Sequence, residues 1–326
     1  MVRAFKGGDL SSRLSRIGSP EDSWRADLAW ARHGLALLLG AVAALLLVLA
    51  EPGPLHAAPV ETGYARVGDL DMYYEVHGDM EAKGEPVIVL HGAYMTTGMM
   101  RPLVDGLATG RKVFVVDFQG HGRTADIDRP ITYQALADDI AAFMKTMGLK
   151  RADIVGYSMG GGVAYQLAIR HPDRVRRMTA AAASFRKDGL YPELLEIFET
   201  MTAQSFAGTP WEKAYKEVAP DPDGFEALVE KLVELDSTIE DWPEADMAAI
   251  AAPTLVLSGD ADIVRPEHSV RIYRLLGGGP IAPHFMAASV DELAILPGTT
   301  HLGVMERMDL VVPMVNAFFS KSKPSQ

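Results

Sequence analysis

One stretch, residues 153–162, constrains the fold of this chain more than any other. It reads Asp-Ile-Val-Gly-Tyr-Ser-Met-Gly-Gly-Gly, an apolar run that ends in a serine between glycines, and a helical pattern of apolar residues follows it. A strand that turns so sharply into a helix strains the serine backbone and lifts its hydroxyl clear of the sheet, so residues two positions to either side must be small. The stretch therefore predicts a strand, a tight turn that presents Ser158, and a helix whose positive N-terminal end favours negative charge at the same place.

The pattern Gly-x-Ser-x-Gly around Ser158 is by itself also compatible with an ordinary glycine-rich turn. Residues farther along the chain favour a reactive serine, because a serine hydroxyl needs a base within hydrogen-bond reach and that base needs an anionic partner. Asp262 and His301 each follow a predicted strand, in the chain order that this motif uses. We predict Ser158, Asp262 and His301 as catalytic residues, with Asp260 as a competing acid because it leaves the same strand as Asp262.

Two backbone N–H groups would stabilise the oxyanion that forms during acyl transfer. Met159, next to the serine, is predicted to supply one, and the loop after the strand at 86–90 is predicted to supply the other from Ala93, with Tyr94 as the alternative. His91 in the same loop is predicted to be structural, because its ring can hydrogen-bond the loop backbone. The residues predicted to contact substrate are Tyr94, Met95, Met99 and Tyr157.

Apolar runs alternate with helical patterns over most of the chain. Continuous apolar runs are typical of strands that are buried on both faces of a parallel sheet. Besides the strand before Ser158, strands are predicted at 86–90, 112–117, 178–183, 253–258 and 292–296, with two short strands within 64–76. Besides the helix after Ser158, helices are predicted at 103–107, 132–147 and 304–319. This alternation predicts an α/β fold, a mostly parallel sheet with helices on both faces.

Between residues 185 and 249 the pattern changes to helices only, which predicts a helical cap inserted into the sheet domain. The α/β core is accordingly predicted to comprise residues 59–184 and 250–322. Residues 1–58 are predicted to form a basic lead-in, a hydrophobic segment and a linker.

The hydrophobic segment spans residues 34–50, which carry no charge. At ~1.5 Å per residue a helix of this length measures roughly 25 Å, which is short for a membrane span and sufficient for the core of a signal peptide. We therefore expect a protein that is exported across the cytoplasmic membrane or attached to it through residues 34–50. The alternatives are cleavage near Ala50 or Ala58, retention as an anchor, and a start of translation after residues 1–24.

Composition excludes several kinds of site. The chain has no cysteine, which excludes disulfides, thiolate catalysis and cysteine-ligated metals. A net charge of −12 argues against a nucleic-acid-binding protein. The histidines and acidic residues do not follow a metal-ligand spacing, and the glycines near Ser158 do not match a dinucleotide-binding fingerprint, so neither a metal nor a cofactor is expected. The sequence carries no signal for an oligomeric state.

Over residues 60–320 the chain resembles the α/β-hydrolase superfamily. The motifs that carry the resemblance are His91-Gly92, residues 117–123 (Asp-Phe-Gln-Gly-His-Gly-Arg), the turn at Ser158, residues 259–262 with Val264 and Pro266, and residues 298–301. The resemblance implies an eight-stranded sheet, a lid inserted after the sixth strand, and a serine hydrolase without a cofactor. Haloalkane dehalogenases and epoxide hydrolases have a similar layout but an aspartate at the turn, so the serine argues against those reactions. Residues 277–289 depart from the pattern as a glycine-rich insertion.

The reaction expected from these residues is hydrolysis of a small carboxylic ester or similar acyl substrate through an acyl-enzyme. Acyl transfer, perhydrolysis of the haloperoxidase type and carbon-carbon bond hydrolysis would use the same three side chains and are alternatives. A non-catalytic binding protein on this fold is the alternative from another class.

Overall fold

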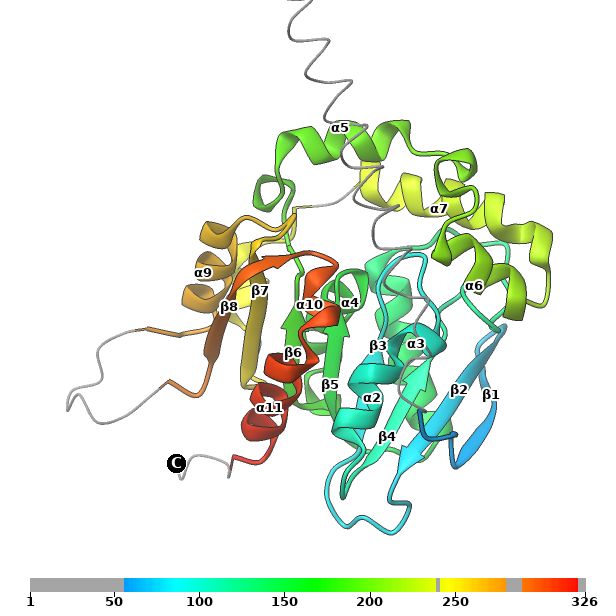
Figure 1. Ribbon diagram of the computed structural model, residues 1–326. Coiled ribbons are helices and arrows are strands. Elements are labelled where there is room, and N and C mark those ends of the chain that lie inside the picture. The colour runs from blue at the N-terminus through cyan, green and yellow to red at the C-terminus, as the bar shows by residue number, and fades with distance from the viewer. Residues whose placement is uncertain (1–55, 239–240, 280–288, 322–326) are drawn as a thin grey trace, which may run out of the picture. The chain divides into compact units, whose positions relative to one another are not determined.

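The computed structural model describes residues 56–238, 241–279 and 289–321 of the 326-residue chain. Within these residues, eight strands form one sheet in the order β1-β2-β4-β3-β5-β6-β7-β8 (Figure 1). Strand β2 pairs antiparallel with β1 and with β4, and every other neighbouring pair runs parallel. The predicted fold class is therefore confirmed. The strands are β1 Glu61–Val67, β2 Leu70–Gly78, β3 Val87–Leu90, β4 Lys112–Val116, β5 Ala152–Tyr157, β6 Val175–Ala181, β7 Thr254–Ala261 and β8 Glu292–Thr300.

The central strands are buried on both faces, as their continuous apolar runs predict. In β3, Val87 and Val89 pack into one hydrophobic cluster, whereas Ile88 and Leu90 pack into a second one. All four side chains are 0% exposed. Because successive side chains of a strand point to opposite faces, the two clusters are the two sides of the sheet.

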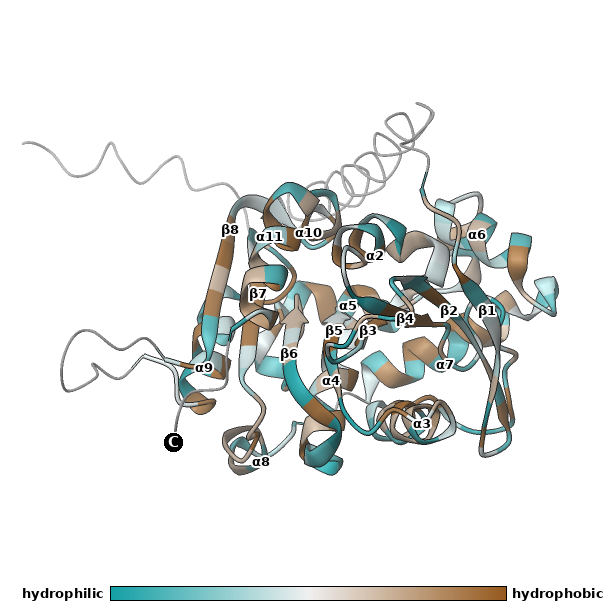
Figure 2. Ribbon diagram, turned by 90° about the horizontal axis from the view of Figure 1, so that it is seen from below, coloured by the Kyte–Doolittle hydropathy of each residue, from teal (hydrophilic) through white to brown (hydrophobic). Residues whose placement is uncertain are grey.

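Helices cover both sides. Residues of α2, α10 and α11 belong to the cluster around Val87, and residues of α3, α4, α8 and α9 belong to the cluster around Ile88. Figure 2 shows hydrophobic and hydrophilic residues next to one another along helices such as α7 (Phe225–Ser237) and α9, as expected of helices with one buried side. The bounds are α2 Arg101–Leu107, α3 Tyr133–Thr146, α4 Met159–Arg170, α8 Glu244–Ala248, α9 Pro266–Leu275, α10 Gly303–Glu306 and α11 Met308–Phe319.

Two helical segments differ from the prediction. The closing helix, predicted as one piece over 304–319, is divided at Arg307, whose backbone (φ −95°, ψ 46°) leaves the helical region between α10 and α11. Helix α9 is not predicted, because its buried residues are His268, Ser269 and Ile272, of which one is apolar. His268 Nε2 lies 3.0 Å from Ser184 Oγ, and Ser269 Oγ donates to Ser258 Oγ at 3.0 Å, so both buried polar side chains have a hydrogen-bond partner.

The segment between β6 and β7 contains helices α5 Pro192–Thr200, α6 Pro210–Val218 and α7 Phe225–Ser237, which we call the cap helices. In Figure 1 they lie together at the top, beyond the ends of the strands. The short α8 follows them in sequence and packs against α4 beside the sheet. The boundaries 185–249 for a cap, and 59–184 with 250–322 for a core, remain our proposal.

The predicted signal or anchor segment, residues 34–50, lies outside the described residues, as does the rest of 1–55. In the three described ranges, no helix has both the length and the apolar character needed to cross a membrane. This finding runs against the prediction of an exported or membrane-anchored protein, which we withdraw as a correction. Of the predicted insertion at 277–289, residues 280–288 also lie outside the described residues.

Candidate active site

Ser158 occupies the sharp turn between β5 and α4 that the sequence predicts. Its backbone has φ 53° and ψ −119°, a conformation that residues other than glycine rarely adopt. The turn is held by hydrogen bonds on both sides: Ser158 N–H donates to Ala181 O of β6 (2.8 Å), and the N–H groups of Gly161 and Gly162 donate to Ser158 O (2.8 and 3.1 Å). The serine is thus strained and fixed at the start of a helix, where backbone N–H groups point toward it.

The glycines around Ser158 are required by close backbone contacts. A Cβ atom on Gly156 would lie 2.1 Å from Gly160 O, and one on Gly160 would lie 2.3 Å from Leu90 O of β3. No side chain fits at such distances. Because Gly156 and Gly160 have no side chain, β3, β5 and α4 can lie close together directly below the serine.

Asp262 and His301 meet because β7 and β8 continue farther than predicted. The two parallel strands pair as far as Ala261 and Thr300, so Asp262 and His301 directly follow paired residues at one edge of the sheet. His301 Nδ1 lies 2.7 Å from Asp262 Oδ1, and His301 Nε2 lies 3.0 Å from Ser158 Oγ. Since an ionised carboxylate only accepts, Nδ1–H donates to Asp262 and Nε2 is free to accept the serine proton.

The competing acid, Asp260, points elsewhere. It is exposed, and its Oδ1 accepts a hydrogen bond from Thr299 N–H at 3.1 Å. The backbone N–H groups of Gly298 and Thr299 lower the pKa of its carboxyl group. Asp262, by contrast, is 4% exposed. Of the two acids, Asp262 is the one in contact with the His301 ring.

Tyr157, predicted to contact substrate, lies below His301 instead. Its hydroxyl donates to His301 O at 2.9 Å, and the two rings stack with their centroids 5.2 Å apart. The side chain is 2% exposed, which leaves no surface for a substrate. We therefore assign Tyr157 to holding His301 in position.

The loop after β3 approaches Ser158 from the other side. Tyr94 has a positive φ of 63°, and its N–H donates to His121 Nε2 at 3.3 Å. In the part of the chain that the structure describes, the N–H groups of Ala93 and Met159 donate to no other residue. Of the two candidates in this loop, Ala93 therefore has its N–H available to an oxyanion, whereas the N–H of Tyr94 is engaged.

Two buried histidines hold this loop. His91 Nδ1–H donates to Gly92 O (2.7 Å), and its Nε2 accepts from Phe118 N–H (3.1 Å). His121 Nδ1–H donates to Gln119 O (2.9 Å), while its Nε2 accepts the Tyr94 bond. Burial lowers the pKa of His91 well below its usual range and that of His121 to about 4, so both rings are neutral and can accept. The structural role predicted for His91 fits these contacts.

The remaining predicted substrate residues divide into two groups. The ring of Tyr94 points toward the cap helices and packs on Phe206, with the ring centroids 4.4 Å apart. Met95 is 7% exposed and packs in the hydrophobic cluster that also contains Tyr157. Met99 is half-buried and packs against the same cluster. Of these three, Tyr94 is therefore the residue that faces the cap.

Sequence reasoning did not assign roles to three residues near the site. His121 lies within a motif that the sequence does show, but its bond to Tyr94 is a tertiary contact. Lys231 and Asp236 both lie on α7, Lys231 on the side that contacts the loop at 126–129. A signal for Asp236 exists in the sequence: it follows Leu232 by one helical turn, so a carboxylate continues an apolar stripe.

In the described ranges, no three His, Asp or Glu side chains gather as metal ligands would.

Comparisons with known proteins agree with this architecture. A family model described as "alpha/beta hydrolase fold" matches residues 85–210. The protein named "Putative carbamate hydrolase RutD" from Azorhizobium caulinodans is 32% identical over 134 residues, which are 41% of this chain and 49% of that protein. A pimeloyl-(acyl-carrier protein) methyl ester esterase from Vibrio vulnificus is 28% identical over 144 residues, covering 42% of this chain and 54% of that protein. The chain thus spans about half the length of these curated relatives.

Among solved structures, a mutant of the meta-cleavage product hydrolase from Pseudomonas fluorescens matches with a TM-score of 0.63 and 21% identity. The match covers 80% of this chain and 97% of that protein, and it shows a common fold. The family model matches residues 85–210, the solved structure shares the fold, and this chain belongs to the α/β-hydrolase superfamily.

Proposed function

We propose that the protein hydrolyses a carboxylic ester through an acyl-enzyme on Ser158. The observation that carries the proposal is the hydrogen-bonded chain from Ser158 Oγ through the His301 ring to Asp262 Oδ1, with distances of 3.0 and 2.7 Å. A serine in a strained turn, an imidazole whose Nε2 lies beside the serine oxygen, and a buried carboxylate in this order are the parts that nucleophilic acyl transfer needs.

In the first half-reaction, Ser158 Oγ attacks the ester carbonyl carbon as its proton passes to His301 Nε2. The positive charge on the ring is stabilised by Asp262, which keeps Nδ1–H as a donor. The carbonyl oxygen becomes an oxyanion, and the N–H groups of Ala93 and Met159 are our candidates to stabilise it, each contributing roughly 3 kcal/mol. When the C–O bond breaks, His301 returns the proton to the alcohol that leaves.

In the second half-reaction, water attacks the acyl-enzyme while His301 again accepts a proton. The tetrahedral intermediate then collapses, the acid leaves, and Ser158 regains its proton. No other group is needed to balance the two steps.

The names of the relatives suggest which carbonyl compounds to test. One is a methyl ester esterase, which supports an ester. Another is named as a carbamate hydrolase, and a carbamate carbonyl would be attacked by the same serine. Carbamate hydrolysis is therefore our second candidate. Acyl transfer, perhydrolysis and carbon-carbon bond hydrolysis would share the first half-reaction and differ in the acceptor or in the bond that breaks.

The test combines labelling with turnover. We expect a fluorophosphonate probe to label the wild-type protein and not Ser158→Ala, because the probe reacts with activated serines. We also expect p-nitrophenyl esters of graded acyl length to be hydrolysed by the wild type, with a loss of at least ~10³-fold in Ser158→Ala. An aryl carbamate measured in parallel distinguishes the second candidate. Absence of labelling, or labelling that persists in Ser158→Ala, would contradict the proposal.

A further inference from the structure

Tyr94 has a strained backbone at the edge of the proposed oxyanion site. In the described ranges, the non-glycine residues with a positive φ are Tyr94 (63°), Ser158 (53°) and Ala182 (54°). A side chain disfavours this conformation, which persists only where surrounding contacts hold it. At Ser158 the strain presents the nucleophile. Tyr94 lies next to Ala93, so the contacts that hold Tyr94 bear on the second oxyanion donor.

The loop that contains Ala93 and Tyr94 begins directly beside Ser158. A Cβ atom on Gly160, two residues after the serine, would lie 2.7 Å from His91 O. The N–H group of Ala93 donates to no other residue among those that the structure describes. Ala93 thus lies between His91, which is packed against α4, and the strained Tyr94. The position of its N–H group therefore depends on where Tyr94 is held.

On the core side, Tyr94 is held by His121. The Tyr94 N–H group donates to His121 Nε2 at 3.3 Å, and His121 Nδ1–H donates to Gln119 O at 2.9 Å. The His121 ring is 0% exposed, and its centroid lies 5.0 Å from that of the His91 ring. Because both ring nitrogens are engaged and the ring is enclosed, His121 offers Tyr94 an acceptor at a fixed place.

A buried carboxylate holds the far end of the same loop. Thr97 N–H donates to Asp117 Oδ1 at 2.7 Å, and Arg123 N–H donates to Asp117 Oδ2 at 2.8 Å. Asp117 is 0% exposed. The loop after β3 and the loop after β4 are thus joined at Tyr94 and again at Thr97, so the core side of the site is one connected unit.

On the cap side, the ring of Tyr94 packs on Phe206, with the centroids 4.4 Å apart. Phe206 ends the short 3₁₀ helix Ala203–Phe206 between α5 and α6, and it is 8% exposed. Its ring also contacts Trp211 and Phe225, at centroid distances of 6.4 and 5.8 Å. Aromatic pairs of this kind stabilise a structure beyond the burial of their area. Phe206 is therefore fixed among cap residues and contacts a loop of the core.

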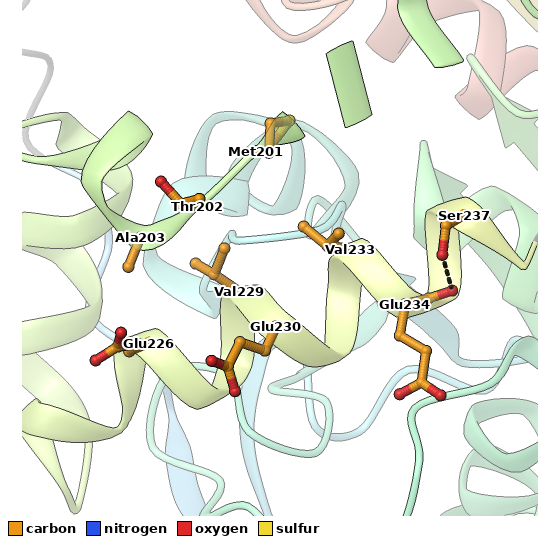
Figure 3. A pocket seen from close by; sticks show the side chains of 9 residues that line it. All are labelled: Met201, Thr202, Ala203, Glu226, Val229, Glu230, Val233, Glu234 and Ser237. Carbon is orange, nitrogen blue, oxygen red and sulfur yellow. Dashed lines mark hydrogen bonds between the residues drawn. The ribbon is translucent and has the colours of Figure 1, made fainter. Parts of the chain in front are cut away.

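The segment that leads to Phe206 has open space on its other side. A groove of about 370 Å³ runs between residues 201–203 and α7, and Figure 3 shows Val229 and Val233 on the side of α7 that faces these residues. Space of this size leaves room for residues 201–203 to shift toward α7. The ring contact of Phe206 with Tyr94 opposes such a shift, so it links the position of the cap to that of the β3 loop.

Tyr94 is thus held from the core by His121 and from the cap by Phe206. We propose that His121 and Phe206 are positioning residues of the oxyanion site, which together keep Tyr94 in its strained conformation and thereby fix the Ala93 N–H group beside Ser158. The contact between cap and core then sets how well the oxyanion is stabilised. The assignment rests on the proposed ester hydrolysis, and neither side chain takes part in the bond-breaking steps.

The first test uses p-nitrophenyl acetate, butyrate and hexanoate with the full 326-residue chain. We expect Phe206→Leu to lower kcat/KM by about tenfold for all three esters, because the same oxyanion forms in each reaction. A residue that only lined a pocket for the acyl chain would affect the hexanoate and spare the acetate. Phe318→Leu is the matched control: Phe318 is 0% exposed and lies over Arg177 near the start of β6, so kcat/KM should not change.

The second test replaces the acceptor on the core side. His121→Leu removes it, whereas His121→Gln places an amide oxygen near the position of Nε2. We expect His121→Leu to lower kcat/KM by about tenfold or more for each ester, and His121→Gln to recover most of that loss. Thermal unfolding identifies the variants that fold. If His121→Leu does not fold, the comparison of Phe206→Leu with Phe318→Leu decides.

Two outcomes would overturn the proposal: a loss in Phe206→Leu that is absent for the acetate and grows with acyl length, or an unchanged kcat/KM in folded Phe206→Leu or His121→Leu. Failure of the proposed function looks different, because the wild type then hydrolyses none of the esters. In that case hydrogen exchange of a peptide that covers residues 92–97 decides. Faster exchange in Phe206→Leu than in the wild type and Phe318→Leu supports the positioning of Tyr94, and equal exchange in all three contradicts it.

Discussion

At the scale of single residues, the site depends on which of two neighbouring acids touches the histidine. Asp262 is buried and accepts from His301 Nδ1–H, whereas Asp260 is exposed and accepts from the backbone of β8. A carboxylate at this position fixes the tautomer of the imidazole, and an amide does not, because its NH₂ group can donate to Nδ1 and move the proton to Nε2. His301 Nε2 could then no longer accept the serine proton.

We therefore expect Asp262→Asn to lower kcat for a p-nitrophenyl ester by roughly 10³–10⁴-fold. Asp260→Asn should cost far less, because Asp260 does not contact His301. Steady-state kinetics of the two variants, with circular dichroism to check folding, test the assignment. Equal losses in both variants would show that the wrong acid has been assigned.

A second prediction at this scale concerns Gly160. A methyl group there would lie 2.3 Å from Leu90 O, so Gly160→Ala must push α4 away from β3. We expect a loss of about 1–3 kcal/mol in the free energy of unfolding in urea. Activity should fall as well, because Ala93 lies in the loop after β3 and Met159 begins α4, so the two N–H groups would move apart. Gly84→Ala, where the added methyl meets nothing within 4 Å, is the control and should change neither quantity.

At the scale of elements, Lys231 of α7 joins the cap helices to the loop that follows β4. Lys231 Nζ donates to Asp126 Oδ2 (2.6 Å), Ile127 O (2.8 Å) and Arg129 O (3.0 Å), all in the loop that follows β4. Gln119 in the same loop donates to the same three residues. The contact sets the position of α7 along the loop.

Lys231→Met keeps the length of the side chain and removes the three hydrogen bonds. We expect it to lower the free energy of unfolding by about 1–3 kcal/mol, because Ile127 O and Arg129 O lose a charged donor. Native-state hydrogen exchange of the α7 amides should become faster than that of β5, as the cap opens locally before the core unfolds. Lys216→Met removes an exposed pair with Glu212 and should have an effect of ~0–1 kcal/mol. Unchanged α7 exchange in Lys231→Met would contradict the attachment.

At the scale of the whole molecule, a fall in pH changes the stability of the fold in opposite directions through the buried histidines and through the buried carboxyl groups. Burial lowers the pKa of His91 well below its usual range and those of His121 and His268 to about 4. An unfolded histidine binds a proton near pH 6.5, so acidification below that value favours the unfolded chain and stability is lost. These three groups are neutral acceptors in the folded protein.

The buried carboxyls act in the other direction. Burial raises the pKa of Asp117 to about 7, that of Asp153 to about 6 and that of Asp236 to about 7. Between pH 4 and 7 the folded chain binds protons at these groups that the unfolded chain does not bind, so acidification in this range stabilises the fold. Single variants separate these contributions.

We expect Asp236→Leu to be more stable than the wild type, with a gain that depends on pH. Above pH 7 the wild type holds an ionised carboxylate that its surroundings disfavour and that leucine removes, so the gain is largest there. As the pH falls through 7 toward 4, Asp236 becomes protonated in the folded wild type and the gain shrinks. Urea unfolding of both proteins at pH 5 and pH 8 measures this difference in the free energy of unfolding. A variant less stable than the wild type at pH 8 would indicate that Asp236 has a structural role instead.

Much of the site could be predicted because its signals are local. The turn at Ser158 needs Gly156 and Gly160 within two positions, and the apolar runs of β3 and β5 identify strands that are buried on both faces. The α/β fold class follows from the alternation of such runs with helices. Residues 34–50 show the limit of composition alone, because the localisation derived from their hydrophobicity had to be withdrawn.

Other parts could not be predicted, because they depend on which distant segments come into contact. Tyr157 looks like a pocket residue beside the serine, yet its hydroxyl is taken by His301 O, more than a hundred positions away in the sequence. In α9, the polar residues His268 and Ser269 are buried beside hydrogen-bond partners on other segments, Ser184 and Ser258, which the local sequence does not indicate. The longer pairing of β7 with β8, which carries Asp262 to His301, is also a property of two strands together.

The sequence alone therefore determined the fold class, the strained serine and the chain order of its partners, because each of these is encoded within a few neighbouring residues. Only the tertiary structure decided that Asp262 rather than Asp260 meets His301, that the N–H of Tyr94 is engaged by His121, and that the Tyr157 hydroxyl is engaged by His301 O. The physical reason is that hydrogen bonding and burial depend on distance in space, and the chain order of residues does not specify that distance until the sheet has formed.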